Sequence, residues 1–576
     1  MSQFDYILIF ILSLVVFGTG LAFSRTGRDM KSFFSGGGNI PWWISSLSLF
    51  MSFFSAGTFV VWGSIAYDSG FVAVTIQWTM AISGFLIFMY IAKRWKRTRT
   101  LTAAEYITQR FGEKTQKIYT YLFVLISFFT AGAFLYPVAK IVNVSTGFPM
   151  EWIVVVLGLT ILLYTTVGGL WAVLATDVLQ FIILLAAVVV VIPLAFNETG
   201  GVKAFIDKAP DDFFLLLNED YTLWFLFAFM IYSFFFIGGN WAYVQRYTSV
   251  KDEKDAGKVG LLFGILYLIF PLIWMLPPMI YRTINPSLDG LGEIEGAYLM
   301  MCKQALPVGM LGLMIAGMVF ATASSVNTTL NMMAAVTTND LYRAFNKNAS
   351  EKKLMRVARV STFLFGCGTI IVALLVPHLG GIVNVVLTVA AITGVPLYAP
   401  PIWALFSKRQ TAVSILSVTI ISLLINAFFK FLAPAWLGVT LDRADEQALG
   451  ALVPLTLLFL YELYARYSGK ESEDFNQYQV LRAREANEQV SPAVDLQARQ
   501  DKRYGIKVIT IAALITGIII FTIGFIAEKG NIYVFIMGAI IIALCIYVLI
   551  INKKNKVKNT LKKEEVCNEE RRFIEV

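Results

Sequence analysis

Charged residues and histidine are scarce in this sequence. Of its 576 residues, 15% are charged and 57% are apolar, whereas a soluble protein carries about 25% charged residues. This deficit excludes an ordinary soluble enzyme, a disordered chain and a collagen-like or coiled-coil protein. One histidine cannot build a histidine-based metal site, so a zinc protease with an HExxH motif is excluded as well.

Cysteine is also rare and has no pattern. The four cysteines form no CxxC pair and no regular spacing, which excludes a disulfide framework and a structural zinc site. Long uncharged runs fill the chain instead. We therefore expect an all-α polytopic membrane protein whose functional site lies between its helices.

The apolar runs predict about fifteen transmembrane helices. A spanning helix needs about 20 apolar residues, because about 30 Å of hydrocarbon is crossed at 1.5 Å per residue. The candidate runs are 5–24, 43–67, 70–92, 118–145, 151–167, 170–196, 219–245, 259–281, 298–339, 357–378, 381–407, 411–433, 449–465, 505–527 and 531–552.

The basic residues predict the orientation of these spans. If the N-terminus is outside, 39 of the 47 lysines and arginines fall in inner segments and 8 in outer ones. Positive residues are enriched in cytoplasmic loops, so we expect the N-terminus outside and the C-terminus inside. The basic tail 553–576 is expected to lie against anionic lipid headgroups. No nucleic-acid partner is expected, because no folded basic domain exists to present these charges.

Two spans contain signals of an interrupted helix. The second carries Ser52, Ser55, Gly57 and Thr58 near its middle, and the seventh contains tandem glycines at 238–239. Hydrogen bonding of the small polar side chains to neighbouring helices is the alternative explanation. Two interrupted helices, each opening one half of the chain, indicate a transporter site between inverted repeats.

The ninth span contains a cluster of oxygen atoms. Ser324 and Ser325 are adjacent, and the Ala321 carbonyl lies one turn earlier. Sodium is a hard cation that prefers oxygen ligands, so the cluster suggests a sodium site, although helix packing by small polar residues explains the same pattern. Asp177 in the sixth span is either an ion or proton ligand or an interfacial carboxylate.

Four stretches resemble the sodium/solute symporter family. They are SFFSGGGNIPWW, ATDVLQ, QRYTSVKDEKDAGK and ATASSVNTTLN, and the resemblance runs from about residue 5 to about residue 435. That family includes bacterial sodium/galactose and sodium/sialic acid symporters and the animal sodium/glucose transporters. The resemblance implies a leucine-transporter-type core of five plus five inverted helices.

With that core, the chain divides into eight parts. These are an extra helix and loop (1–42), the first repeat (43–196), an outer loop (197–218), the second repeat (219–407), two accessory helices (408–465), an inner segment (466–504), two further accessory helices (505–552) and the tail (553–576).

The resemblance also implies the residues that bind sodium and solute. The common sodium site maps to the carbonyls of Met51, Phe54 and Ala321 and the hydroxyls of Ser324 and Ser325. A second sodium site maps to Asp177, Ser324, Asn327 and Thr328. The substrate positions map to Phe53, Ser55, Thr58, Gln77, Thr130, Ser233, Phe236 and Tyr267.

The expected function is sodium-coupled import of a small organic solute by alternating access, with Na⁺ as the coupling ion. A sugar or sugar derivative is the first expectation for the solute, in a multi-pass protein of the cell membrane, in particular a bacterial inner membrane. The alternative is a sodium- or proton-coupled carrier of an amino acid, a carboxylate or sialic acid. A membrane enzyme is disfavoured because the acidic residues of this chain are scattered. A non-transporting sensor is disfavoured because the short inner segment offers no output domain.

Overall fold

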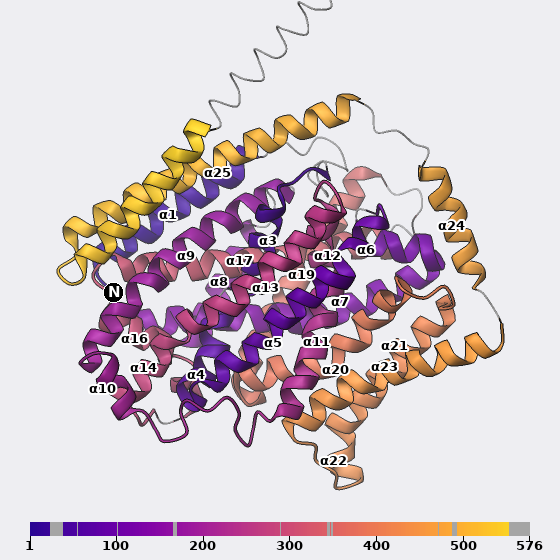
Figure 1. Ribbon diagram of the computed structural model, residues 1–576, viewed down its shortest axis with the longest axis horizontal. Coiled ribbons are helices and arrows are strands. Elements are labelled where there is room, and N and C mark those ends of the chain that lie inside the picture. Colours follow the sequence, from indigo (N-terminus) through magenta and orange to yellow (C-terminus); the bar gives the residue numbers. More distant parts are fainter. Residues whose placement is uncertain are drawn as a thin grey trace, which may run out of the picture.

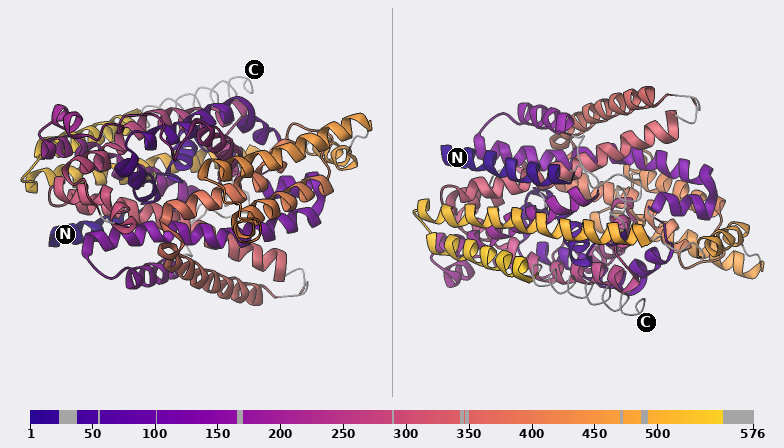
Figure 2. Two further views of the ribbon diagram at one scale, coloured as in Figure 1. Left: turned by 90° about the horizontal axis from the view of Figure 1, so that it is seen from below. Right: turned by 90° about the horizontal axis from the view of Figure 1, so that it is seen from above.

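The computed structural model consists of helices that mostly run along one common direction (Figure 1). The same common direction of the helices is visible in two further views (Figure 2). The structure describes residues 1–23, 38–54, 56–100, 102–164, 170–288, 290–342, 346, 350–469, 472–486 and 492–551. In this part of the chain, the β structure is limited to one isolated bridge between Ile40 and Val250. The expected all-α class is confirmed.

The helices of the first part of the chain are α1 Gln3–Ala22, α3 Trp42–Met51, η2 Thr58–Trp62, α4 Gly63–Ser69, α5 Val72–Leu86, η3 Ile87–Ile91, α6 Ala92–Arg97, α7 Ala103–Thr146, α8 Met150–Tyr164, α9 Leu170–Thr199 and α10 Val202–Lys208. The helices that follow are α11 Leu223–Gly239, α12 Trp241–Thr248, α13 Glu253–Trp274, α14 Leu276–Ile284, α15 Leu291–Ile294, α16 Ala297–Ala305, α17 Met310–Val336, η4 Thr337–Tyr342, α19 Glu351–Leu375, η5 Val376–Leu379 and α20 Gly381–Ala404. The last group is α21 Ala412–Ala427, η6 Phe428–Leu432, α22 Ala433–Trp436, α23 Arg443–Tyr467, α24 Glu473–Ala486, α25 Pro492–Ile526 and a helix at Asn531–Ile551.

The number of membrane-crossing helices differs from the expected count. Eleven of the described helices are long and apolar enough to cross a membrane, and the bent pair α11 and α12 makes a twelfth. Three shorter apolar helices lie at Trp42–Met51, Met150–Leu159 and Met310–Thr322. Each of the fifteen expected runs overlaps a described helix. The count of about fifteen and the orientation of the termini are nevertheless not confirmed.

Both expected interruptions are present. In the first, α3 ends at Met51 and helical backbone resumes at Ala56. In the second, α11 ends at Gly239, and Asn240 has φ −59° and ψ 130°, an extended conformation that cannot continue the helix. The helix axis bends by 60° between α11 and α12.

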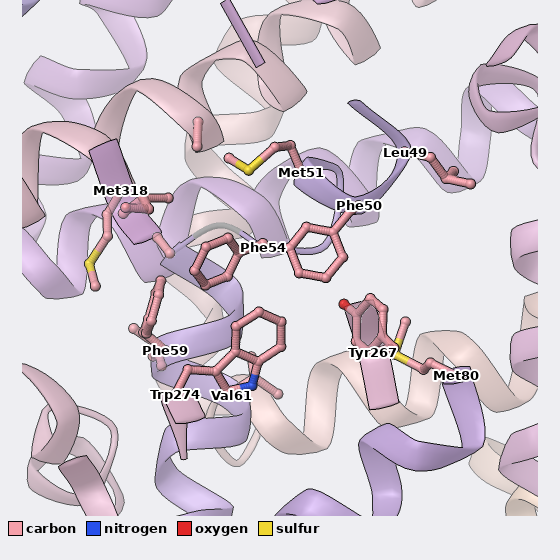
Figure 3. Close-up of a cluster of buried hydrophobic side chains, with 14 of the residues drawn as sticks. Leu49, Phe50, Met51, Phe54, Phe59, Val61, Met80, Tyr267, Trp274 and Met318 are labelled. Atoms are coloured by element: carbon pink, nitrogen blue, oxygen red, sulfur yellow. The ribbon is translucent and has the colours of Figure 1, made fainter. Parts of the chain in front are cut away.

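Aromatic side chains fix the position of the first interruption. The Phe54 ring lies on the Trp274 ring of α13 at 4.5 Å between centroids, and Phe50 contacts the Tyr267 ring at 5.3 Å (Figure 3). All four side chains are buried. Buried aromatic pairs contribute packing beyond the apolar area that they bury, so the interruption is held in a rigid part of the core.

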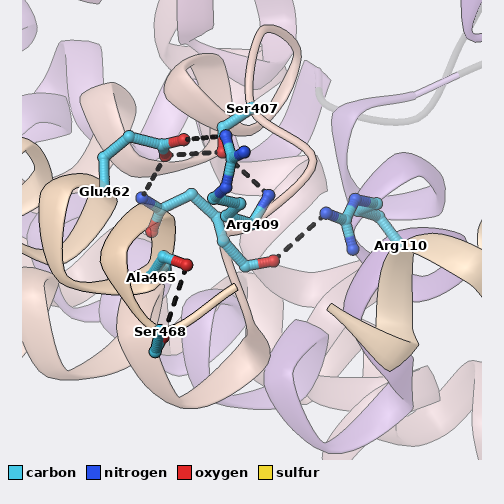
Figure 4. A network of polar contacts seen from close by, with 7 residues as sticks. Arg110, Ser407, Arg409, Glu462, Ala465 and Ser468 are labelled. Carbon is cyan, nitrogen blue, oxygen red and sulfur yellow. Dashed lines mark hydrogen bonds and ion pairs between the residues drawn. The ribbon is translucent and has the colours of Figure 1, made fainter. Parts of the chain in front are cut away.

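The accessory helix α23 is attached to the rest of the protein by polar contacts. The Glu462 carboxylate accepts hydrogen bonds from Ser407 Oγ at 2.6 Å and Gln410 Nε2 at 3.2 Å. Arg110 of α7 donates to the Gln410 carbonyl at 3.1 Å (Figure 4). The network joins α23 to the connection between α20 and α21 and to α7.

The N-terminal helix α1 is attached to α17 through one carboxylate. Asp5 Oδ1 accepts the backbone N–H groups of Gly309 at 2.8 Å and Gly312 at 3.0 Å, and Asp5 is 2% exposed. These N–H groups belong to the start of α17, where a helix has free donors and a positive dipole end. Asp5 therefore caps a helix that follows it by about 300 residues.

Replacing Asp5 with alanine should lower the stability of the protein, because the cap on α17 is lost. Loss of a helix cap costs about 0.5–2 kcal/mol, and thermal denaturation of the purified protein measures it. Asp442 caps α23 through the Asp445 N–H at an exposed site. Asp442→Ala is the matched control and should have the smaller effect. Equal melting temperatures for the Asp5 variant and the unaltered protein would contradict a structural role of this cap.

Candidate functional site

A cavity of about 240 Å³ lies where the two broken helices meet α7, α9, α17 and α20. Binding cavities for small molecules are mostly apolar, with a few placed polar groups. The aromatic residues of this wall are Phe53, Trp62, Phe123, Phe134, Phe229, Tyr232, Phe236, Tyr243 and Tyr398. Its polar residues are Ser52, Thr58, Ser127, Thr130, Asp177, Ser233, Asn240, Arg246, Ser325, Thr329 and Thr393.

The first break lies at this cavity. Met51, Ser52 and Phe53 line the cavity at the end of α3. The Thr58 hydroxyl group, beyond the break, donates to the Phe53 carbonyl. Because the helix is interrupted, carbonyl groups near its end lose partners within the helix. Such carbonyls are the groups that hold small cations in interrupted membrane helices.

The second break is fixed by Asn240. Its Oδ1 accepts the Ala242 N–H at 3.0 Å and so caps α12. Its Nδ2 donates to the Tyr398 hydroxyl of α20 at 3.1 Å. Trp95 Nε1 donates to the Gly238 carbonyl at 2.7 Å, which satisfies one carbonyl at the end of α11. The polar groups that the break releases are therefore bonded to neighbouring helices.

Two of the predicted ligands of the common sodium site face the cavity. Met51 and Ser325 line it, and the Ser325 hydroxyl donates to the Ala321 carbonyl at 3.4 Å. The Phe54 side chain is buried against Trp274, away from the cavity wall. The Ser324 side chain lies outside the described part of the chain. Neutral hydroxyl and carbonyl oxygens are the ligands that sodium prefers, so the donor set of these residues fits sodium.

Asp177 takes part in a buried polar network. Ser48 Oγ of α3 donates to Asp177 Oδ2 at 2.5 Å and accepts from Arg246 Nε at 3.4 Å and Nη2 at 3.3 Å. Arg246 Nη1 also donates to the Ala242 carbonyl at 2.6 Å. Asp177 and Arg246 are 7% and 5% exposed. The serine hydroxyl thus bridges two buried opposite charges on α9 and α12.

The other predicted ligands of a second sodium site are Ser324, Asn327 and Thr328, and their side chains lie outside the described part of α17. Asp177 itself lines the cavity. Its carboxylate also accepts the Ser48 hydroxyl.

The predicted substrate positions divide into three groups. Phe53, Thr58, Thr130, Ser233 and Phe236 all line the cavity. Ser55 lies outside the described residues. Gln77 and Tyr267 are buried in the core at 0% and 1% exposure and are not among the described residues of the wall.

Gln77 and Tyr267, which lie behind the cavity wall, both have partners in the core. Gln77 Oε1 accepts the Trp274 Nε1–H at 3.0 Å, and Gln77 Nε2 donates to the Ala73 carbonyl at 3.4 Å. Tyr267 contacts Phe50 and Phe53 edge-on. Their neighbours occupy the space that a solute would need to reach them.

Ser233 differs from the other hydroxyl groups of the cavity. It is 1% exposed, and its Oγ is buried without a hydrogen-bond partner. By contrast, Ser127, Thr130 and Thr393 each donate to a carbonyl one turn earlier in their own helix. A buried polar atom without a partner is costly, which is a reason to expect a partner from a bound molecule.

Sequence reasoning missed several polar residues that hold this site together. Ser48 stands in the serine-rich run of the second span, and Arg246 follows the seventh span, but neither pattern shows that they meet at Asp177. Thr322 is a third, since it bonds to the first broken helix at Ala56. The signal in each case was a polar residue inside an apolar run.

A family model and several known proteins match this chain. A family model described as the sodium:solute symporter family matches residues 33–421. The chain is similar to a sodium/glucose cotransporter of Vibrio parahaemolyticus, with 26% identity over 471 residues that cover 75% of this chain and 86% of the relative. It is also similar to the human sodium/iodide cotransporter, with 28% identity over 484 residues that cover 78% of this chain and 72% of the relative.

A solved structure shares the fold. It is the substrate-bound, outward-open state of a Na⁺-coupled sialic acid symporter. The two chains align with a TM-score of 0.64 and 21% identity, over 80% of this chain and 97% of the other. The overall arrangement of helices is therefore shared with that structure.

Proposed function

Because the chain belongs to the sodium:solute symporter family, we propose that it imports a small organic solute together with sodium, and that this solute is a sugar or a sugar derivative. The protein is a multi-pass membrane transporter and not an enzyme. One observation supports the finer proposal most directly. Both broken helices and the Ser325 hydroxyl of α17 converge on a single aromatic-lined cavity.

The proposed sites divide the cavity between ion and solute. Sodium binds the carbonyls of Met51, Phe54 and Ala321 and the hydroxyls of Ser324 and Ser325, while Asp177, Ser324, Asn327 and Thr328 offer a second position. The solute contacts Phe53, Ser55, Thr58, Thr130, Ser233 and Phe236, with Gln77 and Tyr267 behind the wall.

Sodium drives the cycle by joining two helices. The ion ties the break after α3 to α17, and this favours the state in which the solute cavity is formed. Solute binding then closes one side, and separation of the two helices on the other side releases the ion and the solute. The cell membrane, in particular a bacterial inner membrane, is the proposed location.

The available sodium energy is sufficient for concentrative uptake. One sodium ion that moves through ~100 mV gains about 2.3 kcal/mol, and a tenfold gradient adds about 1.4 kcal/mol. Together they could concentrate the solute by roughly several hundred-fold, and a second ion would square that factor.

The charges of the cavity favour a neutral or aminated sugar over an acidic one. Arg246 is the one cation among the described residues of the wall, and it is bonded to Ser48 and to the Ala242 carbonyl. A carboxylate solute would therefore have to compete with groups that already hold this guanidinium. The aromatic faces and hydroxyl groups remain available to a neutral ring.

A screen of the purified protein tests the proposed function. We expect neutral or aminated sugars to raise the melting temperature in sodium chloride but not in potassium chloride. Amino acids and sugar acids are the comparison arms. The same sugar should then enter proteoliposomes when a sodium gradient is imposed. Uptake driven by a pH gradient without sodium, or stabilisation by amino acids alone, would contradict the proposal.

Replacing Ser233 with alanine should weaken solute binding without changing the sodium dependence. A hydrogen bond to an uncharged group contributes about 0.5–1.5 kcal/mol, so the affinity should fall by about 2- to 10-fold. The affinity is measured by titration with the solute that the screen identifies. Ser422→Ala is the matched control, because Ser422 Oγ is also buried without a partner but lies on α21, away from the cavity. Equal affinities in both variants would remove Ser233 from the solute site.

A further inference from the structure

The second half of the first broken helix starts with a backbone hydrogen bond to another helix. The Ala56 N–H donates to Thr322 Oγ1 of α17 at 3.0 Å, and both residues are fully buried. Thr322 Oγ1 in turn donates to the Met318 carbonyl at 2.9 Å. The hydroxyl group therefore accepts one hydrogen bond and donates another.

This contact replaces a bond that the broken helix cannot make by itself. The first N–H groups of a helix have no carbonyl partner within that helix, and a side chain just before the helix usually supplies the acceptor. Here the acceptor comes from a residue 266 positions later in the chain. Thr322 thus caps a helix to which it does not belong.

The contact lies beside the proposed sodium ligands. Figure 3 shows Met318 of α17 next to Phe54, which lies in the break, and Phe59, which follows it. The rings of Phe54 and Phe59 are 5.3 Å apart. Ser325, which lines the cavity, follows Thr322 by one helical turn.

We propose that Thr322 is a positioning residue that sets the affinity for sodium. Helix α3, the first part of the broken helix, packs against α13 and α9, and α17 packs against α7 and α9, so the Ala56–Thr322 bond joins the first broken helix directly to α17. Sodium joins the same two helices, and this inference therefore rests on the proposed sodium-coupled function. The bond keeps the oxygens of the break and of α17 close together before sodium arrives. Apparent affinity scales with the fraction of molecules in the competent state.

Two substitutions at Thr322 separate its hydroxyl group from its volume. Thr322→Val keeps the shape and removes the hydrogen bond, while Thr322→Ser keeps the hydroxyl group. Thr369→Val is the matched control, because Thr369 is 1% exposed and donates to the Phe365 carbonyl one turn earlier at 3.0 Å. This control loses a hydrogen bond within its helix, but no hydrogen bond to another helix among the described residues.

Sodium chloride itself is the probe. The purified full chain is titrated with sodium chloride at constant ionic strength, with potassium chloride as the balance, and the melting temperature is followed. We expect the sodium midpoint to rise about three- to tenfold in Thr322→Val and to stay within about twofold in Thr322→Ser and Thr369→Val. An unchanged midpoint in Thr322→Val, or an equal rise in Thr369→Val, would overturn the proposal.

Hydrogen exchange in potassium chloride gives a readout that does not depend on sodium. The peptide that contains Ala56 should exchange faster in Thr322→Val than in the other two variants, because its N–H has lost its acceptor. If the unaltered protein shows no response to sodium, the proposed function fails. The exchange rates still decide whether Thr322 holds the break, and equal rates in all variants show that it does not.

Discussion

Replacing Ser325 with alanine is expected to remove most sodium-driven uptake while the protein stays folded. Ser325 lines the cavity, and among the described residues its hydroxyl group makes one hydrogen bond, a long one of 3.4 Å to the Ala321 carbonyl. We therefore expect the substitution to leave the fold intact. A hydrogen-bonding or ligand contact to a charged group contributes about 1.5–3 kcal/mol, so the affinity for sodium should fall by about 10- to 100-fold. Sodium titration of uptake and of the melting temperature measures this fall.

The matched control for this prediction is Ser145→Ala. Ser145 is a helical serine as well, buried on α7, and its Oγ donates to the Ile141 carbonyl at 2.6 Å, away from the cavity wall. Its sodium midpoint should equal that of the unaltered protein. A Ser325 variant that transports with unchanged sodium dependence would show that the sodium site is assigned to the wrong residues.

Replacing Asp177 with alanine is expected to have the second large effect, and this effect has two parts. The substitution leaves Arg246 buried without its opposite charge, which costs about 3–5 kcal/mol of stability. It also removes the one carboxylate of the proposed second sodium site. We therefore expect a lower melting temperature together with a less steep dependence of uptake on sodium concentration.

A second substitution separates the two parts. In the double variant Asp177→Ala with Arg246→Gln, the uncompensated guanidinium is gone, so much of the lost stability should return. The steepness of the sodium dependence should not return, because the carboxylate is still missing. A Hill coefficient near two in the stable double variant would remove Asp177 from ion coupling and leave it as the partner of Arg246. A single variant as stable as the unaltered protein would contradict the Ser48 bridge.

The interruptions of the helices could be predicted because their causes are local. Tandem glycines lower helix propensity by about 1 kcal/mol each, and α11 ends at the second of them, Gly239. The run with Ser52 and Gly57 marked the first break for a similar reason. In both cases the sequence around the break determines that a continuous helix is unfavourable.

The contacts that hold these breaks could not be predicted in the same way. Ala56 meets Thr322, and Ser48 meets both Asp177 and Arg246, over separations of more than one hundred residues. A hydroxyl group or a charge in an apolar run signals that a partner exists, because an unpaired polar group in lipid is costly. It does not identify the partner.

The predicted substrate positions were likewise only partly predictable from the sequence. Five substrate positions that the family resemblance implied do line the cavity, whereas Gln77 and Tyr267 lie behind it against Trp274 and Phe50. The family resemblance gave Gln77, a polar residue in an apolar helix, the role of a ligand. Which side of its helix faces the cavity depends on how α5 packs against α11 and α13.

The scarcity of charge in the sequence was enough to determine a helical membrane protein, because lipid accepts only segments that satisfy their own backbone groups. Composition and local propensity also determined where the two key helices break. Only the tertiary structure decided which polar groups meet at the breaks, because side chains far apart in the chain are brought together by helix packing. That packing places Ser325, Ser233 and the Asp177 network around one cavity.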